Sequence, residues 1–112
     1  MPEEIPLSGL RANQRRMNTS AHNVANVSTD ELSRHRVSAQ ERPSGGVDTR
    51  SDVVELSEQG KEIARAVKGP QNNVDLASEA VEQIEAREAF KGNARTLRTQ
   101  DRLMQLLLDI FV

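Results

Sequence analysis

The sequence predicts an elongated all-α protein in which an N-terminal helix pairs with a long C-terminal helix as a coiled coil. Helical spacing of apolar residues continues over 72–111, a length of about 60 Å at about 1.5 Å per residue. A compact chain of 112 residues has a radius of gyration of only about 13 Å, so this helix cannot lie inside its own globule. The composition also predicts a helical, non-globular chain. Two Phe and no Trp or Tyr are too few large side chains for a good single core. Ala, Leu, Glu, Gln and Arg are frequent, and they favour helix.

The first segment, residues 1–29, is expected to be one helix. Pro6 can occupy its first turn, and Ser8 is the alternative N-cap. Asn23 and Asn26 suit its end, because Asn tolerates left-handed backbone. Large apolar residues recur at seven-residue spacing and are expected to make the pairing within the chain: Leu10, Met17 and Val24. So few apolar groups would leave this helix marginal alone, and it therefore needs a partner.

The middle segment, residues 30–71, is expected to be a flexible linker with one short helix. No hydrophobic period is clear up to the Pro-Ser-Gly-Gly turn signal at 43–46. Ser57 is a plausible N-cap for the short helix, and Gly69-Pro70 would end it. Its apolar residues at helical spacing are Ile63, Ala64 and Val67.

The last segment, residues 72–112, contains the long helix, which Asn72 or Asn73 could cap. Three apolar residues in its seam are expected to face the N-terminal helix: Leu76, Phe90 and Leu97. Its last two turns are apolar on several sides, and such a helix is normally buried all round. Little else in a short chain could cover it, so we expect other subunits to do so. One alternative is that the middle helix folds back over this end.

A basic stripe precedes the apolar turns. Its members are three and four residues apart, so they share a face of the helix: Lys91, Arg95, Arg98 and Arg102. The stripe is either a solvated face or a surface that meets an acidic neighbour and fixes register. With the apolar turns it forms the predicted assembly interface, which adds Leu103, Leu107, Ile110 and Phe111.

The residue types argue against an enzyme, a cofactor or a metal site. The chain has no Cys, and His22 and His35 have no carboxylate at a ligand spacing. Three glutamates are expected on an exposed helix face rather than in an acid/base pair: Glu79, Glu82 and Glu85.

Nucleic-acid binding and membrane insertion are not expected either. The arginines Arg34, Arg36 and Arg42 lack an aromatic platform in a chain of net charge −2. The apolar runs are far shorter than a membrane span, and residues 1–10 lack the pattern of a signal peptide.

Both ends of the sequence resemble one family. Residues 8–14 (SGLRANQ) and 21–29 (AHNVANVST) resemble the N-terminal signature of bacterial flagellar rod and hook proteins. Residues 73–76 (NVDL) and 86–94 (AREAFKGNA), followed by LRT at 97–99 and Asp101, resemble the C-terminal signature of the same family. The order of the two motifs at opposite ends makes the pair far more specific than either motif alone.

The resemblance implies a structural subunit of the flagellar basal-body rod. In that family the terminal segments pair as an α-helical coiled coil that lines an axial tube, and subunits leave through the flagellar type III export apparatus without a cleaved signal. The implied location is the periplasmic rod, and the implied partners are other axial subunits, the export apparatus and further copies of this chain. The span 30–71 is too short for the family's usual outer β-domain. The alternative is a soluble adaptor or regulator that binds axial proteins before assembly.

Overall fold

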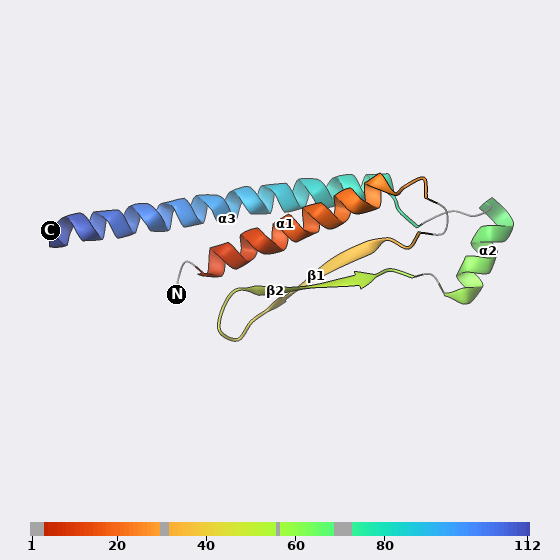
Figure 1. Ribbon diagram of the computed structural model, residues 1–112, viewed down its shortest axis with the longest axis horizontal. Coiled ribbons are helices and arrows are strands. Elements are labelled where there is room, and N and C mark those ends of the chain that lie inside the picture. Colours follow the sequence, from red (N-terminus) through yellow and green to blue (C-terminus); the bar gives the residue numbers. More distant parts are fainter. Residues whose placement is uncertain (1–3, 30–31, 56, 69–72) are drawn as a thin grey trace.

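The chain is elongated in the computed structural model, which describes residues 4–29, 32–55, 57–68 and 73–112. The order of elements is α1, β1, β2, α2, α3 (Figure 1). The molecule measures 73 × 26 × 15 Å and has a radius of gyration of 19.5 Å. A compact chain of this length would have a radius of about 13 Å. The predicted elongated shape is therefore confirmed.

Helix α1 spans Glu4–Ala25, and the predicted N-terminal helix is confirmed. Pro6 lies in its first turn, where a missing N–H costs no intrahelical hydrogen bond. Ser8 is not the N-cap. It lies further along the helix, where its hydroxyl donates to the Ile5 carbonyl at 2.7 Å and accepts from the Val47 amide at 3.1 Å. Ser8 thus ties α1 to the middle of the chain instead of starting the helix.

A β-hairpin corrects the all-α prediction and replaces most of the expected flexible linker. Strand β1, His35–Glu41, pairs antiparallel with β2, Val47–Val53, with His35 opposite Val53 and Glu41 opposite Val47. In the connecting turn, Gly45 and Gly46 have φ values of 90° and 86°. Glycine adopts positive φ without steric strain because it has no Cβ. A lone two-stranded hairpin is marginal in water, so its stability depends on the face that packs against α1.

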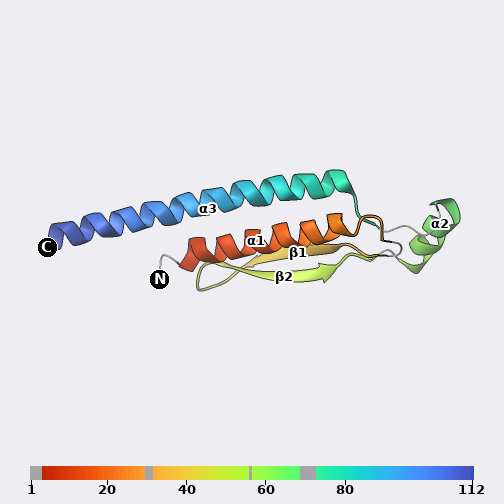
Figure 2. The same ribbon diagram turned by 45° about the horizontal axis from the view of Figure 1, so that its top comes forward.

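Helix α2 spans Glu58–Lys68, as the sequence predicted, and Ser57 caps it. The Ser57 hydroxyl accepts from the Gly60 amide at 3.1 Å, which satisfies one free donor of the first turn. Figures 1 and 2 place α2 at one end of the molecule and the end of α3 at the other. The alternative that α2 folds back over the apolar end of its own chain is therefore wrong.

Helix α3 spans Leu76–Phe111 and runs antiparallel to α1 (Figure 1). Asp75 is its N-cap and accepts from the Ala77 amide at 3.1 Å. The prediction of Asn73 as the cap is wrong, and Asn72 lies outside the described residues. Asp75 competes successfully because its carboxylate both accepts a backbone hydrogen bond and carries negative charge at the positive helix end.

Helix α1 lies between α3 and the hairpin, and it packs on both (Figures 1 and 2). The core along it is small and polar. In the described part of the chain, Ala12 and Ala86 are the buried hydrophobic residues. The remaining buried residues of the two helices are glycine, proline or polar: Pro6, Ser8, Gly9, Asn13, Ser20, Asn23 and Glu79. Close approach of backbones, rather than large apolar side chains, sets how α1 and α3 fit together.

Gly9 offers a test of this close packing. A Cβ at Gly9 would lie 2.6 Å from Nδ2 of Asn93, whereas one at Gly92 would meet nothing within 4 Å. Gly92→Ala should stabilise the isolated chain by up to about 1 kcal/mol through helix propensity. Gly9→Ala should be less stable than Gly92→Ala by about 1–3 kcal/mol, because it overpacks the helix interface.

Urea unfolding followed by circular dichroism measures both changes. The Asn93→Ala background serves as the control, since it removes the obstructing side chain. In that background the two glycine substitutions should change the free energy of unfolding by similar amounts. Equal stabilisation by Gly9→Ala and Gly92→Ala in the natural background would contradict the close approach.

Candidate functional site

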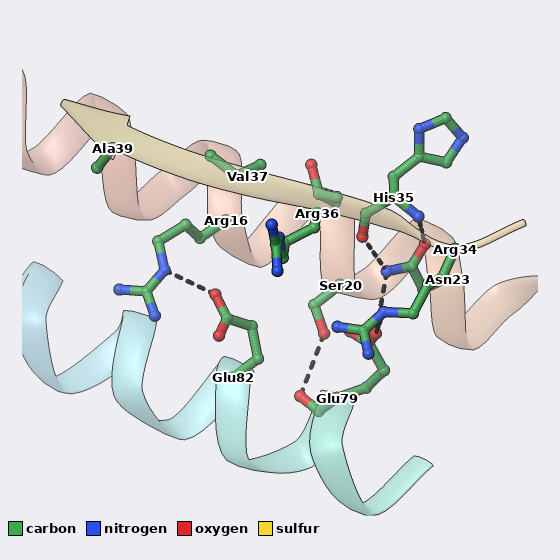
Figure 3. A pocket seen from close by; sticks show the side chains of 11 residues that line it. Arg16, Ser20, Asn23, Arg34, His35, Arg36, Val37, Ala39, Glu79 and Glu82 are labelled. Atoms are coloured by element: carbon green, nitrogen blue, oxygen red, sulfur yellow. Dashed lines mark hydrogen bonds and ion pairs between the residues drawn. The ribbon is translucent and has the colours of Figure 1, made fainter. Parts of the chain in front are cut away.

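Asn23 joins α1, β1 and α3 through a buried set of hydrogen bonds (Figure 3). Its Nδ2 donates to the His35 carbonyl at 2.7 Å and to Oε1 of Glu79 at 3.0 Å, and its Oδ1 accepts from the His35 amide at 2.9 Å. The residue is 1% exposed. One side chain therefore satisfies both backbone groups of a strand residue and a carboxylate from another helix. Sequence reasoning placed Asn23 at the helix end for local reasons and missed this role.

Glu79 is the second buried member of this junction, and the prediction that it lies on an exposed face is wrong. It is 1% exposed. Nε of Arg34 lies 3.6 Å from its Oε1, and the Ser20 hydroxyl donates to its backbone carbonyl at 3.2 Å. A buried carboxylate persists only with a countercharge and hydrogen-bond donors, and Arg34 and Asn23 supply them. These partners come from other elements, so the spacing of glutamates on α3 could not reveal them.

Arg16 extends the contact between α1 and α3. Its Nε donates to Oε1 of Glu82 at 2.6 Å, and its guanidinium lies 3.5 Å from the carboxylate of Glu85. The hydrogen bond from Arg16 to Glu82 raises the pKa of Arg16 above its ordinary value, against the opposing effect of burial. Glu82 is half-buried and Glu85 is exposed, so the three predicted exposed glutamates differ sharply in environment.

Asn73 closes the open end of the hairpin. Its Oδ1 accepts from the Arg34 amide and its Nδ2 donates to the Val54 carbonyl, both at 2.6 Å. Asn73 therefore bridges the entry and exit of the two strands just before α3 begins. At the other end, Arg15 on α1 donates to Oγ1 of Thr49 at 2.7 Å. The hairpin is thus fixed to the helices at several points along its length.

A cavity of about 240 Å³ lies where α1, β1 and α3 meet (Figure 3). Arg16, Arg34, Arg36, Glu79 and Glu82 line it, together with His35 and small residues of α1 and β1. No group of three metal-ligating side chains occurs among the residues that the structure describes. The rings of His22 and His35 pack edge to face with centroids 5.4 Å apart. The arrangement is that of a structural polar junction that holds three elements in register.

The residues predicted to pair the helices are not among the fully buried residues of α1 and α3. Five are half-buried: Leu10, Met17, Val24, Phe90 and Leu97. Leu76 is 53% exposed and sits at the start of α3. Met17 lines a shallow groove of about 300 Å³ with four residues of α3, Ala80, Gln83, Ile84 and Arg87. The contribution of these six residues to pairing stays a prediction. The most buried residues of the two helices are small or polar.

The predicted assembly residues all lie on the exposed surface of α3: Lys91, Arg95, Arg98, Arg102, Leu103, Leu107, Ile110 and Phe111. Lys91 forms an ion pair with Glu88 at 3.1 Å. Every residue of 101–112 is exposed, and we call this stretch the free end of α3. Gly9 of the antiparallel α1 lies against Asn93, and α1 begins only five residues earlier, at Glu4. Helix α1 therefore does not reach the free end of α3. No helix in the described ranges has the length and apolar character needed to cross a membrane.

Two families of known proteins match the chain, one at each end. Residues 5–30 match the flagella basal body rod protein family, and residues 71–110 match the C-terminal family of flagellar basal body rod FlgEFG proteins. The chain belongs to the flagellar basal-body rod proteins. A search of curated proteins finds no match to it.

The resemblance seen in the two terminal motifs is therefore confirmed. In this rod protein the matched segments cover all but one terminal residue of α1 and of α3, the two helices that pack side by side. Together the matches cover more than half of the sequence. Both families are structural, so this rod protein has a structural role in the basal body and associates with other basal-body components.

Asn23→Ala tests the polar junction. The change leaves the His35 backbone groups and the Glu79 carboxylate without their buried partner, so we expect a loss of about 2–4 kcal/mol in the free energy of unfolding. Asn18→Ala is the matched control, because Asn18 is exposed on the same helix. Urea denaturation measures both. A loss at Asn23 no larger than at Asn18 would show that the junction contributes little.

The N-cap of α3 gives a pH dependence. Hydrogen bonds from the Ser78 hydroxyl and the Ala77 amide lower the pKa of Asp75 below its ordinary value of 3.8. A carboxylate whose pKa is lower in the folded state than in the unfolded state stabilises the folded state at pH values above the unfolded-state pKa. This stabilisation is lost as the pH falls through the folded-state pKa. We therefore expect the first turn of α3 to fray below about pH 4.

Titration of the Asp75 carboxyl and the Ala77 amide by NMR measures this effect. Asp75→Asn should keep the cap without titrating, because an amide oxygen also accepts the hydrogen bond. An Asp75 pKa at or above 3.8 would contradict the proposed cap strength.

Proposed function

We propose that this chain is an axial subunit of the flagellar rod that joins its neighbours through its terminal helices. The observation that carries the proposal is the free end of α3. All its large apolar residues are exposed: Leu103, Met104, Leu106, Leu107, Leu108, Ile110, Phe111 and Val112. A contiguous apolar surface of this kind marks an interaction site, since water contact with it is unfavourable. Membership of the rod family supplies the class of partner.

The proposed assembly unit consists of the terminal segments 1–29 and 72–112. Within it, Leu10, Met17, Val24, Leu76, Phe90 and Leu97 contribute to pairing in the chain. The stripe formed by Lys91, Arg95, Arg98 and Arg102 meets an acidic neighbour, and Leu103, Leu107, Ile110 and Phe111 become buried. Charge complementarity of this kind fixes register and partner choice more than affinity. Segment 30–71, with its hairpin and α2, connects the two.

The remaining parts of the proposal follow from the family. The subunit reaches the periplasmic rod through the flagellar type III export apparatus, without a cleaved signal, and its role is structural rather than enzymatic. The adaptor alternative predicts a different distribution in the cell. It requires a cytoplasmic pool of the protein in a defined complex with axial proteins.

Leu107→Asp tests the proposal in cells. Leu107 is 53% exposed in the isolated subunit, so the variant should fold and remain as soluble as the natural protein. Burying the new carboxylate between subunits would be costly, so the variant should be absent from purified hook–basal bodies in which the natural protein is present. Immunoblotting of basal-body fractions measures this.

Asn18→Asp is the matched control, because it adds the same charge at an exposed polar position of α1, outside both the basic stripe and the free end. It should enter basal bodies normally. Absence of the natural protein from intact basal bodies, or normal incorporation of Leu107→Asp, would contradict the proposed role of the free end.

A further inference from the structure

Strand β1 has an open edge on the side away from β2. The Val54 amide donates to the Arg34 carbonyl at 2.8 Å, and this bond continues the hairpin ladder just beyond the paired strands. Ladder bonds in an antiparallel pair fall on alternate residues, and the residues between them turn their N–H and C=O groups the other way. Val37 and Ala39 are residues of this second kind. Each therefore presents one donor and one acceptor on the edge of β1 that faces away from β2.

At His35 this edge already has a partner. The N–H and C=O groups of His35 point the same way as those of Val37 and Ala39, and the side-chain amide of Asn23 bonds both of them, at 2.9 and 2.7 Å. Asn23 thus makes the bonds that a paired strand residue would make. It also donates to Glu79, so α3 lies across the edge from β1 (Figure 3). Among the residues that the structure describes, no side chain bonds the backbone of Val37 or Ala39 in this way.

The cavity of about 240 Å³ continues along this edge beyond Asn23 (Figure 3). Val37 and Ala39 line it from β1, and Glu82 lines it from α3. It is partly open to solvent. Neighbouring strands lie about 4.8 Å apart, so a strand added to β1 would lie in this space. Because α3 stands on the far side, one strand can be added there but not a second sheet.

The charges around the cavity favour an acidic ligand. Glu79 and Glu82 line it, but Arg34 and Arg16 already lie against these two carboxylates. Nε of Arg34 is buried and donates no hydrogen bond, since Oε1 of Glu79 lies 3.6 Å away. The Arg36 side chain makes no hydrogen bond or ion pair with the described residues. These two guanidinium groups therefore have donors left for a carboxylate, which is the partner that a guanidinium binds most strongly.

We propose that the open edge of β1 binds an extended acidic segment of another basal-body subunit, which adds a third strand between β1 and α3. The inference rests on the proposed function, because the rod assembly supplies the partner. In strand addition the backbone hydrogen bonds give affinity and alternate side chains give specificity. Partner residues opposite Val37 and Ala39 share their face, where small or β-branched side chains fit. The residues between them share the face of Arg36 and carry the carboxylates.

The segment comes from a different subunit rather than from a second copy of this chain. Outside the helices and the hairpin, the described residues of this chain are already engaged. Residues 26–29 form turns, Asn73 bonds the Arg34 amide and the Val54 carbonyl, and Asp75 caps α3. The hairpin of a second copy does not fit either, because its other strand would meet α3. The described ranges of this chain therefore contain no spare extended segment.

A peptide titration followed by NMR tests the added strand. The probe is acetyl-Thr-Val-Glu-Val-Glu-Thr-amide, which alternates β-branched and acidic residues. It should shift the amide protons of Val37 and Ala39 downfield and slow their exchange with water, because both amides gain a hydrogen-bond acceptor. Few contacts form, so we expect a dissociation constant on the order of 1 mM.

Two control peptides separate strand pairing from charge attraction. N-methylation of both valines removes the donors that reach the carbonyls of Val37 and Ala39, and this peptide should leave their amide signals unchanged. Replacement of both glutamates by lysine should weaken binding strongly, because the arginines then repel the peptide. No shift with the acidic peptide, or equal binding of either control, would overturn the proposal.

Ala39→Pro blocks the edge within the protein. Proline removes the outward N–H of Ala39, which takes no part in the ladder, and proline is tolerated at such edge positions. Ser51→Pro is the matched control, because Ser51 pairs with Val37 and turns its N–H toward the opposite edge, away from β1. The peptide should no longer shift the Val37 amide in Ala39→Pro and should still shift it in Ser51→Pro. Undiminished binding to Ala39→Pro would contradict the strand site.

Arg36→Gln tests the charge preference separately from the backbone pairing. It should weaken binding of the acidic peptide about two- to fivefold, as expected for one exposed ion pair. Binding of a peptide with glutamine in place of both glutamates should be unaffected by the same substitution. An equal loss for both peptides would show that Arg36 does not read the carboxylates.

Photo-cross-linking tests the source of the segment. With p-benzoylphenylalanine in place of Ala39, irradiation of purified hook–basal bodies should join this chain to another basal-body subunit. Mass spectrometry should place the link in an acidic, extended segment of that subunit. The same amino acid in place of Ser51 is the control and should not give this product. A link between two copies of this chain, or no link from position 39, would overturn the choice of partner.

The outcome is separable from that of the proposed function. Natural protein in basal bodies whose β1 edge binds no acidic peptide would overturn the strand site and leave the rod role in place. Peptide binding by a protein that is absent from basal bodies would support the strand site and remove the rod role.

Discussion

Asn23 and Glu79 meet in the interior of a chain that has almost no apolar core. Their hydrogen bonds bring α1, β1 and α3 together, and Arg34 balances the charge of the buried carboxylate. Buried polar groups contribute modest net stability when satisfied, but they are costly when one partner is missing. Such a junction therefore selects one register of the three elements more strongly than it stabilises them. The subunit is held in a specific arrangement with little hydrophobic energy.

That register determines what the molecule leaves exposed. Gly9 permits α1 to approach α3 closely at Asn93, and Ser20 and Asn23 fix the other end of the contact at Glu79. Since α1 is 22 residues long and α3 is 36, this alignment leaves the last turns of α3 without a cover. The apolar free end is thus a geometric consequence of the polar junction. The large apolar residues that could have stabilised a monomer are placed where another subunit can bury them.

Much of the helical part of this structure was predictable. Apolar spacing located all three helices, and the length of the last helix predicted an elongated chain. Ser57 and Pro6 were assigned correctly, because caps and first-turn positions depend on local chemistry. The hairpin was missed, since Val47-Asp-Thr-Arg-Ser-Asp-Val alternates only weakly and β1 contains few apolar residues. Its covered face comes from α1, which lies earlier in the chain and is not visible in a short window.

The sequence by itself determined the helices and the lack of a large apolar core. It also determined the family, through two motifs at opposite ends of the chain. Tertiary structure alone decided the site. Glu79, Glu82 and Glu85 share one helical spacing, yet Glu79 is buried and Glu85 is exposed. Asn23 likewise matched a local rule for helix ends, whereas its actual partners are His35 and Glu79, distant along the chain. Local pattern reports the conformation of a segment, but the burial of a polar side chain depends on which distant groups can satisfy it.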